Sequence, residues 1–105
     1  MKISLTSTCL VLAVASAMQA ALAGDPAAGQ KLADQSCAAC HGKDGVSIAS
    51  LYPNLCGQKA DYLVSQLKAL RDGTRQNPIM NPMAKNLSDA DMENVAAYYS
   101  GLRCP

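Results

Sequence analysis

Apolar side chains recur at helical spacing along much of this chain, and no stretch shows the alternation that a strand requires. From about Lys59 to Arg71 the recurring apolar positions are Tyr62, Leu63, Leu67 and Leu70, with the polar Gln66 at the same spacing. In the final stretch they are Met92, Val95, Ala96 and Tyr99. Residues spaced by three and four share one face of a helix. The pattern therefore predicts an all-α protein in which these faces form the core.

Capping residues predict where the helices begin and end. Asp25 followed by Pro26 is typical of a helix start and predicts a helix that runs to about Gln35. Gly73 can provide a left-handed cap for the second helix. Ser88 opens the last helix as a variant of the capping box, with an acidic residue three positions on, and Gly101 ends it. Residues 74–86 have no periodicity and contain two prolines, so we expect a loop there.

The first residues have the pattern of a secretory signal peptide. Lys2 is followed by a mostly apolar run to Met18, and Ala21-Leu22-Ala23 provides small residues for cleavage. The run is too short and too often interrupted by Ser and Thr for a good membrane span. We expect residues 1–23 to be removed together with Cys9, which leaves residues 24–105 as one domain without an integral membrane segment, in the periplasm.

Charge and composition narrow the function further. The chain has nine Lys and Arg against eight Asp and Glu, so removal of Lys2 leaves the mature domain close to neutral. That balance argues against nucleic acid or an anionic membrane as a partner. The chain also lacks Phe and Trp, and a domain this small would have difficulty burying enough apolar surface unaided. A large apolar cofactor would supply the missing core.

The motif Cys37-Ala38-Ala39-Cys40-His41 identifies that cofactor. Two thiols three positions apart, followed directly by an imidazole, form the attachment signature of c-type haem. The sulfurs reach the two vinyl groups of one porphyrin, and the histidine lies beneath the iron. His41 is the single histidine of the chain. The alternatives are a thioredoxin-type redox pair, which usually lies in a βαβ context, or half of a zinc site.

The order of these elements, with Tyr52-Pro53-Asn54-Leu55 and Leu87-Ser88-Asp89 as further motifs, resembles a class I cytochrome c of the small bacterial monohaem type. It is also similar to one half of the periplasmic dihaem cytochromes, and the resemblance covers Asp25 to Leu102. It implies three to four helices wrapped around one covalent haem c, attached through Cys37 and Cys40.

The resemblance also implies the iron ligands. His41 is the proximal ligand, and the backbone carbonyl of Pro53 holds its other ring nitrogen. In relatives the methionine ligand lies at a set spacing before the Leu of Leu-Ser-Asp, which here indicates Met80, with Met83 as the alternative. A thioether ligand raises the reduction potential. Met92 belongs to the core stripe.

Departures from the family pattern concern Leu32, where relatives usually have an aromatic residue, and two additional cysteines. Because the resemblance brings Cys56 near the end of the last helix, an intramolecular disulfide with Cys104 is expected in an oxidising compartment. The alternatives are that Cys56 is simply a buried small residue while Cys104 frays with the terminus, or that Cys104 forms a bridge to another molecule.

These features predict a periplasmic electron carrier that exchanges one electron with redox protein donors and acceptors, and not an enzyme, since two axial ligands leave the iron no open position. An alternative is a cytochrome subunit of a larger redox enzyme, such as a flavoprotein sulfide dehydrogenase. A third hypothesis is a zinc- or thiol-based domain that uses Cys37, Cys40, Cys56 and Cys104.

Overall fold

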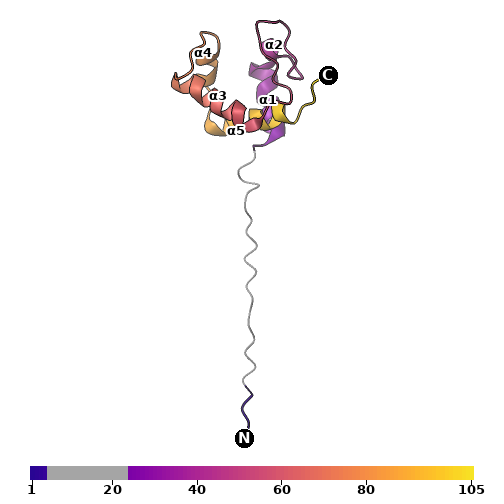
Figure 1. Ribbon diagram of the computed structural model, residues 1–105, viewed down its shortest axis with the longest axis vertical. Helices are drawn as coiled ribbons and strands as arrows, with labels where there is room; N and C mark the ends of the chain where they lie inside the picture. The colour runs from indigo at the N-terminus through magenta and orange to yellow at the C-terminus, as the bar shows by residue number, and fades with distance from the viewer. Residues whose placement is uncertain (5–23) are drawn as a thin grey trace.

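The computed structural model describes residues 1–4 and 24–105, and all regular structure within these ranges is helical. The predicted all-α class is confirmed (Figure 1). The predicted signal peptide falls almost entirely outside the described residues. The helices are α1 (Pro26–Ser36), α2 (Ala38–His41), α3 (Ala60–Asp72), α4 (Met80–Lys85) and α5 (Asp89–Ser100).

The longer helices begin and end where their capping residues predict. The Asp25 side chain accepts a hydrogen bond from Ala27 N at 2.9 Å, and Pro26 occupies the first turn of α1. Ser88 and Asp91 form a reciprocal capping box at the start of α5, with hydrogen bonds of 3.0 Å in both directions. Gly73 ends α3 in the left-handed conformation at φ 80°. Local sequence therefore determines the ends of these helices.

The prediction of a continuous loop over residues 74–86 was wrong, because α4 lies within it. Pro82 is the third residue of α4, and the first N–H groups of a helix have no acceptor within the helix, so proline is tolerated there. The side chain of Asn77 accepts hydrogen bonds from Ile79 N at 3.0 Å and Met80 N at 2.9 Å. With the one-turn α2, this gives five helices in the part of the chain that the structure describes, above the three to four expected.

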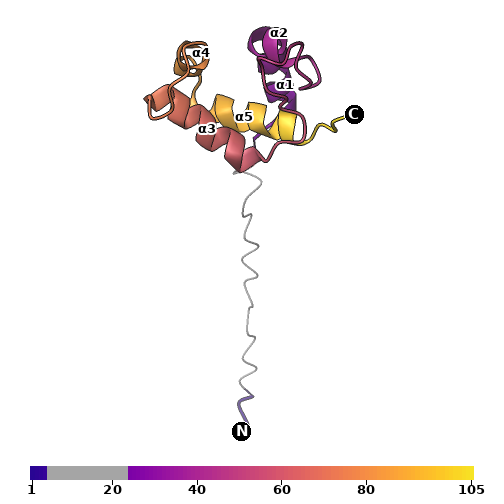
Figure 2. The same cartoon turned by 45° about the horizontal axis from the view of Figure 1, so that its top comes forward.

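Helix α5 forms the base of the domain and carries an arm on each side (Figures 1 and 2). We call residues 26–58, which include α1 and α2, the first arm, and residues 60–87, which include α3 and α4, the second arm. Helix α5 packs against both α1 and α3. Gly29 allows the close crossing with α1, because a Cβ there would overlap the carbonyl oxygen of Asn94. The arms stand apart in both views, and α2 and α4 are at their ends.

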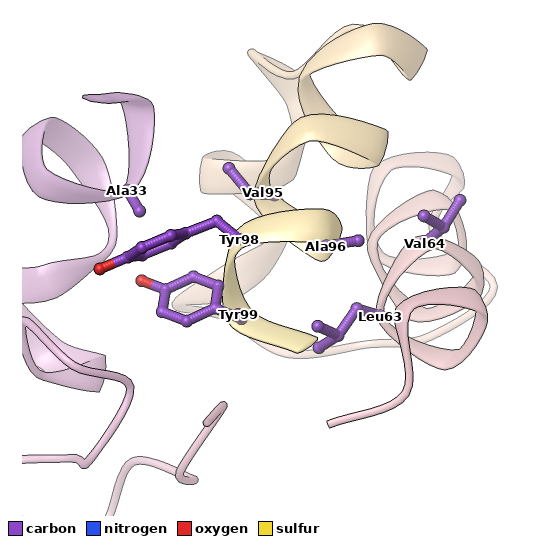
Figure 3. Packing of buried hydrophobic residues seen from close by; sticks show 7 residues of the cluster. All are labelled: Ala33, Leu63, Val64, Val95, Ala96, Tyr98 and Tyr99. Atoms are coloured by element: carbon purple, nitrogen blue, oxygen red, sulfur yellow. The ribbon is translucent and has the colours of Figure 1, made fainter. Parts of the chain in front are cut away.

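The core lies where α5 meets the two arms. Met92 is completely buried, as the core assignment predicted. The whole predicted stripe of α5 is buried, and Tyr98 joins it. The core cluster consists of Ala33, Leu63, Val64, Val95, Ala96, Tyr98 and Tyr99 (Figure 3). It contains few large side chains, in keeping with a domain that needs a cofactor to complete its interior.

Candidate haem site

A cavity of about 470 Å³ lies between the two arms and is also lined by residues of α5. Its volume falls within the range of roughly 300–1,000 Å³ that is usual for cofactor pockets. Both arms and α5 contribute to its walls, which are mostly apolar. The structure brings all the predicted site residues to this one cavity: Cys37, Cys40, His41, Met80 and Met83.

A larger depression of about 650 Å³ lies between residues 42–48 and the C-terminal tail. It is more open to solvent and contains none of the candidate iron ligands or attachment thiols. We therefore place the cofactor in the cavity between the arms, where the chemically relevant side chains are gathered.

His41 is buried and oriented by the chain itself. Its exposed fraction is 8%, and its Nδ1 lies 2.9 Å from the carbonyl oxygen of Pro53. A carbonyl oxygen can only accept, so Nδ1 carries the proton and Nε2 is left with a lone pair available for a metal. The expected role of the Pro53 carbonyl is confirmed.

The loop that carries Pro53 is held at several points. The carbonyl oxygen of Gly45 accepts hydrogen bonds from Leu55 N at 2.7 Å and Cys56 N at 3.0 Å, and Gly57 N donates to Tyr99 O at 2.9 Å. Gly45 itself has φ 74°, a conformation that favours glycine. These contacts fix the acceptor of His41 and so fix the plane of the imidazole ring.

The two additional cysteines meet beside this loop. The sulfurs of Cys56 and Cys104 are within bonding distance, and their Cα atoms are 5.3 Å apart. Cys37 and Cys40 lie apart from this pair. The hypothesis of a zinc or thiol centre built from all four cysteines is wrong, because two of them face each other instead of joining the other pair.

Cys37 and Cys40 are half-buried at the cavity wall. Burial raises the pKa of the Cys37 thiol, whereas the hydroxyl of Tyr99 lowers it. The pKa of Tyr52, a half-buried residue that also lines the cavity, is raised chiefly by its hydrogen bond with the Cys40 side chain. Burial of Cys37 favours its protonated, uncharged thiol. A thioether at this position is also uncharged, so attachment to haem would leave no buried charge.

The methionine candidates lie on α4 in the second arm. Met80 is half-buried, whereas 41% of Met83 is exposed. The position of α4 depends on Asn81, whose Nδ2 donates to Leu70 O at 2.8 Å and Arg75 O at 2.9 Å. Asn81 Oδ1 accepts from Asn77 N at 2.7 Å.

Sequence reasoning missed Asn77 and Asn81 as supports of the site. Each directly precedes a proline, and Asn-Pro pairs are typical turn signals, so their position could have suggested a structural role. That they hold the methionine segment against α3 depends on contacts that the sequence does not reveal.

A polar side chain in the wall of this cavity lacks a partner. The hydroxyl of Tyr99 is buried and has no hydrogen-bond partner, although buried hydroxyls nearly always have one.

The other side chains of the cavity match the chemistry of haem. Apolar walls suit a macrocycle, the thiols suit its vinyl groups, and an imidazole and a thioether suit iron. The residues present therefore fit haem.

Comparison with known proteins agrees with this fit. The family model for cytochrome c matches residues 26–102. The chain is 53% identical over 81 residues to cytochrome c-554(548) of Halomonas halodenitrificans, which covers 74% of this chain and 96% of the relative. It is 38% identical over 103 residues to the thiosulfate dehydrogenase electron acceptor of Stutzerimonas stutzeri, covering 90% of this chain and 48% of the relative.

A solved structure of cytochrome c4 from Acidithiobacillus ferrooxidans superposes with a TM-score of 0.73 at 38% identity, covering 76% of this chain and 51% of that one. The chain thus spans nearly all of the Halomonas halodenitrificans relative and about half of the Stutzerimonas stutzeri and Acidithiobacillus ferrooxidans proteins.

The fold and the site define a haem-binding electron-transfer protein with the class I cytochrome c fold. The chain belongs to the cytochrome c family, it resembles one half of cytochrome c4, and its cofactor is covalently bound haem c. Within the described ranges, no helix is both long enough and apolar enough to span a membrane.

Proposed function

We propose that this cytochrome is a periplasmic one-electron carrier. Its haem is attached through Cys37 and Cys40, and its iron is ligated by His41 and Met80. The observation that carries the proposal is the hydrogen bond of 2.9 Å between His41 Nδ1 and Pro53 O, within a cavity that also holds the other three residues. When bound, the haem supplies an iron that takes up and releases a single electron.

The protein contributes orientation and exclusion of water. Because His41 Nδ1 donates to the Pro53 carbonyl, the plane of the ring is defined, and Nε2 would be left to hold the metal. The apolar walls would keep solvent away from the iron. Ligation by two side chains leaves no open position for a substrate, so we assign no catalytic residue and no enzymatic activity.

The choice of Met80 over Met83 rests on burial and anchoring. Both side chains line the cavity, one helical turn apart. Met80 is the more buried, and its backbone N–H is held by Asn77 at 2.9 Å. Met83 is more exposed, at 41%. A ligand must keep a fixed distance to the metal, which favours the anchored position.

The start of the folded domain supports cleavage after Ala23. Asp25 N donates to the side chain of Asn94 at 2.8 Å, and a Cβ at Gly24 would overlap the backbone of Glu93. Residues 24 and 25, which directly follow the proposed signal peptide of residues 1–23, therefore contact α5 as part of the folded domain.

Redox proteins are the proposed donors and acceptors. Apolar side chains around the cavity are exposed, among them Leu51 at 73%, Tyr62 at 49% and Ile79 at 48%. An apolar rim on a nearly neutral protein suits weak docking that depends little on charge.

The second candidate, a subunit of a larger redox enzyme, is supported by the similarity to a thiosulfate dehydrogenase electron acceptor. A flavoprotein sulfide dehydrogenase is another enzyme of the kind such a subunit would serve. Gel filtration of the protein from its native source separates the two proposals, since a carrier elutes alone and a subunit elutes with its enzyme.

The visible spectrum and intact mass of the purified protein test the main proposal. We expect a c-type haem spectrum and the mass of residues 24–105 plus one covalent haem. A haem-free mass would refute the assignment of Cys37 and Cys40, and retention of residues 1–23 would refute the signal peptide.

A further inference from the structure

Two adjacent tyrosines at the end of α5 differ in how their hydroxyl groups are bonded. Tyr98 Oη donates to the carbonyl oxygen of Lys43 at 3.1 Å. Tyr99 is only 2% exposed, and its Oη has no partner. Both hydroxyls point from α5 toward the first arm (Figure 3). A buried donor without an acceptor is costly, so this hydroxyl calls for a partner that the protein alone does not provide.

The sulfur of Cys37 is a candidate for that partner. Both side chains line the haem cavity. The Tyr99 hydroxyl is close enough to the sulfur to act on it as a donor. This interaction lowers the pKa of the Cys37 thiol and so opposes the increase that burial causes. The two groups nevertheless do not meet hydrogen-bond geometry in this structure.

The ring of Tyr99 has little room to turn toward another partner. A Cβ at Gly45 would lie 3.1 Å from Tyr99 Cδ1, so the ring packs directly on the backbone of Gly45. The carbonyl oxygen of Tyr99 is itself bonded to Gly57 N at 2.9 Å. The hydroxyl is therefore held in place from both the ring and the backbone.

We propose that the hydroxyl of Tyr99 donates a hydrogen bond to the thioether sulfur of Cys37 in the haem-bound protein and thereby raises the reduction potential. The inference rests on the proposed attachment of haem at Cys37. When that sulfur adds to a vinyl group it gives up its hydrogen and keeps its lone pairs, so it can only accept. A donor at the sulfur withdraws electron density from the attached porphyrin edge, which favours the ferrous state.

A haem propionate is the competing acceptor, because carboxylates are stronger acceptors than thioethers. The cavity provides other groups for a carboxylate on the second arm, where Arg75 Nη1 lies 3.1 Å from Gln66 Oε1. Tyr99 instead points toward the first arm (Figure 3), which is the arm that carries Cys37. This arrangement favours the sulfur.

Proton NMR of the ferrous protein tests the contact directly. We expect a slowly exchanging hydroxyl resonance that disappears in Tyr99→Phe and shows nuclear Overhauser effects to the β protons of Cys37 and to the thioether substituent it carries. Effects to propionate methylenes or to a bound water would overturn the proposal, as would the absence of a slowly exchanging hydroxyl.

Redox titration tests the consequence, with Tyr98→Phe as the matched control. Both substitutions remove one hydroxyl from α5 and keep the ring. We expect a lower midpoint potential in Tyr99→Phe and an unchanged one in Tyr98→Phe. Equal potentials in Tyr99→Phe and the parent protein would refute the inference. A protein without covalent haem would instead refute the proposed function, so the two failures are distinguishable.

Discussion

The two arms of this cytochrome hold their proposed iron ligands by different means. In the first arm, His41 is 8% exposed and is oriented by a carbonyl from a loop with several backbone hydrogen bonds. In the second arm, Met80 is half-buried, and its helix is held mainly by the side chains of Asn77 and Asn81. Cys37 and Cys40 also join the first arm to the haem in the proposed function.

This difference indicates which ligand can be exchanged. Moving His41 would require breaking backbone contacts and two thioether bonds, whereas moving Met80 would require the loss of a few side-chain hydrogen bonds. We therefore expect the second arm to open first under stress and the first arm to keep the haem attached.

Replacement of the methionine ligand should have the largest effect. In Met80→Ala we expect loss of the weak long-wavelength band of sulfur-to-iron ligation in the oxidised protein and a lower reduction potential, because a thioether stabilises ferrous iron. Met83→Ala, one turn further along α4, is the matched control and should keep the band. The reverse result would show that Met83 is the ligand. Absorption spectra and redox titration provide both measurements.

Removal of the cysteine pair tests how firmly the first arm is held. We propose that Cys56 and Cys104 form an intramolecular disulfide, which closes a loop with a sequence separation of 48. For a loop of this length, chain entropy gives an upper value of about 4 kcal/mol. The double variant Cys56→Ser/Cys104→Ser should lower the free energy of unfolding by up to that amount.

The single variant Cys104→Ser is the control for this experiment, since it should be destabilised to a similar degree. Alkylation of the unreduced, denatured parent protein followed by mass spectrometry gives an independent check. Two labelled cysteines would show that the disulfide is absent, and a covalent dimer would show that Cys104 pairs with another molecule.

Loss of Asn81 should weaken the second arm without affecting the first. Asn81→Ala removes the donors to Leu70 O and Arg75 O, at a cost of roughly 1–3 kcal/mol in the free energy of unfolding. Because α4 is then less well anchored, we also expect exogenous imidazole to displace the methionine more readily, as measured by loss of the long-wavelength band.

The control is Asn86→Ala, which replaces an exposed asparagine in the same segment. It should leave the free energy of unfolding and the imidazole affinity close to those of the parent protein. Equal imidazole affinity in all three proteins would contradict the anchoring role.

The smallest effect should come from the ion pair between the second arm and α5. Arg71 Nη1 lies 2.7 Å from Asp89 Oδ1 and holds the pKa of that carboxyl below its ordinary value. An acid with a lowered folded pKa adds stability above its unfolded pKa, and this contribution is lost as pH falls through the folded pKa. Asp89 is exposed and Arg71 is only half-buried, so screening by solvent keeps the contribution small.

Asp89→Asn should therefore lower the thermal midpoint only slightly at neutral pH, and the difference from the parent should vanish in acid and in high salt. Asp72→Asn, whose contact with Arg71 is longer at 3.6 Å, should change it less. A difference that persists in acid would exclude the ion pair as its cause.

The sequence by itself determined the helical class, the ends of the three longer helices and the residues that can bind haem. Asp25, Gly73 and Ser88 act on groups within a few positions of themselves, so their effect can be read from neighbouring residues. The motif Cys37–His41 is readable for the same reason, because its spacing matches the chemistry of the haem edge.

Tertiary structure decided the features that depend on contacts between distant residues. The helix at Met80–Lys85 forms in a segment without periodicity because side chains such as Asn81 bond it to α3. The meeting of Cys56 with Cys104, and the contrast between Tyr98 with a backbone acceptor and Tyr99 without one, likewise arise only when separate elements pack together. Such contacts join residues far apart in the chain, so no local sequence pattern predicts which acceptor a buried donor will bond to.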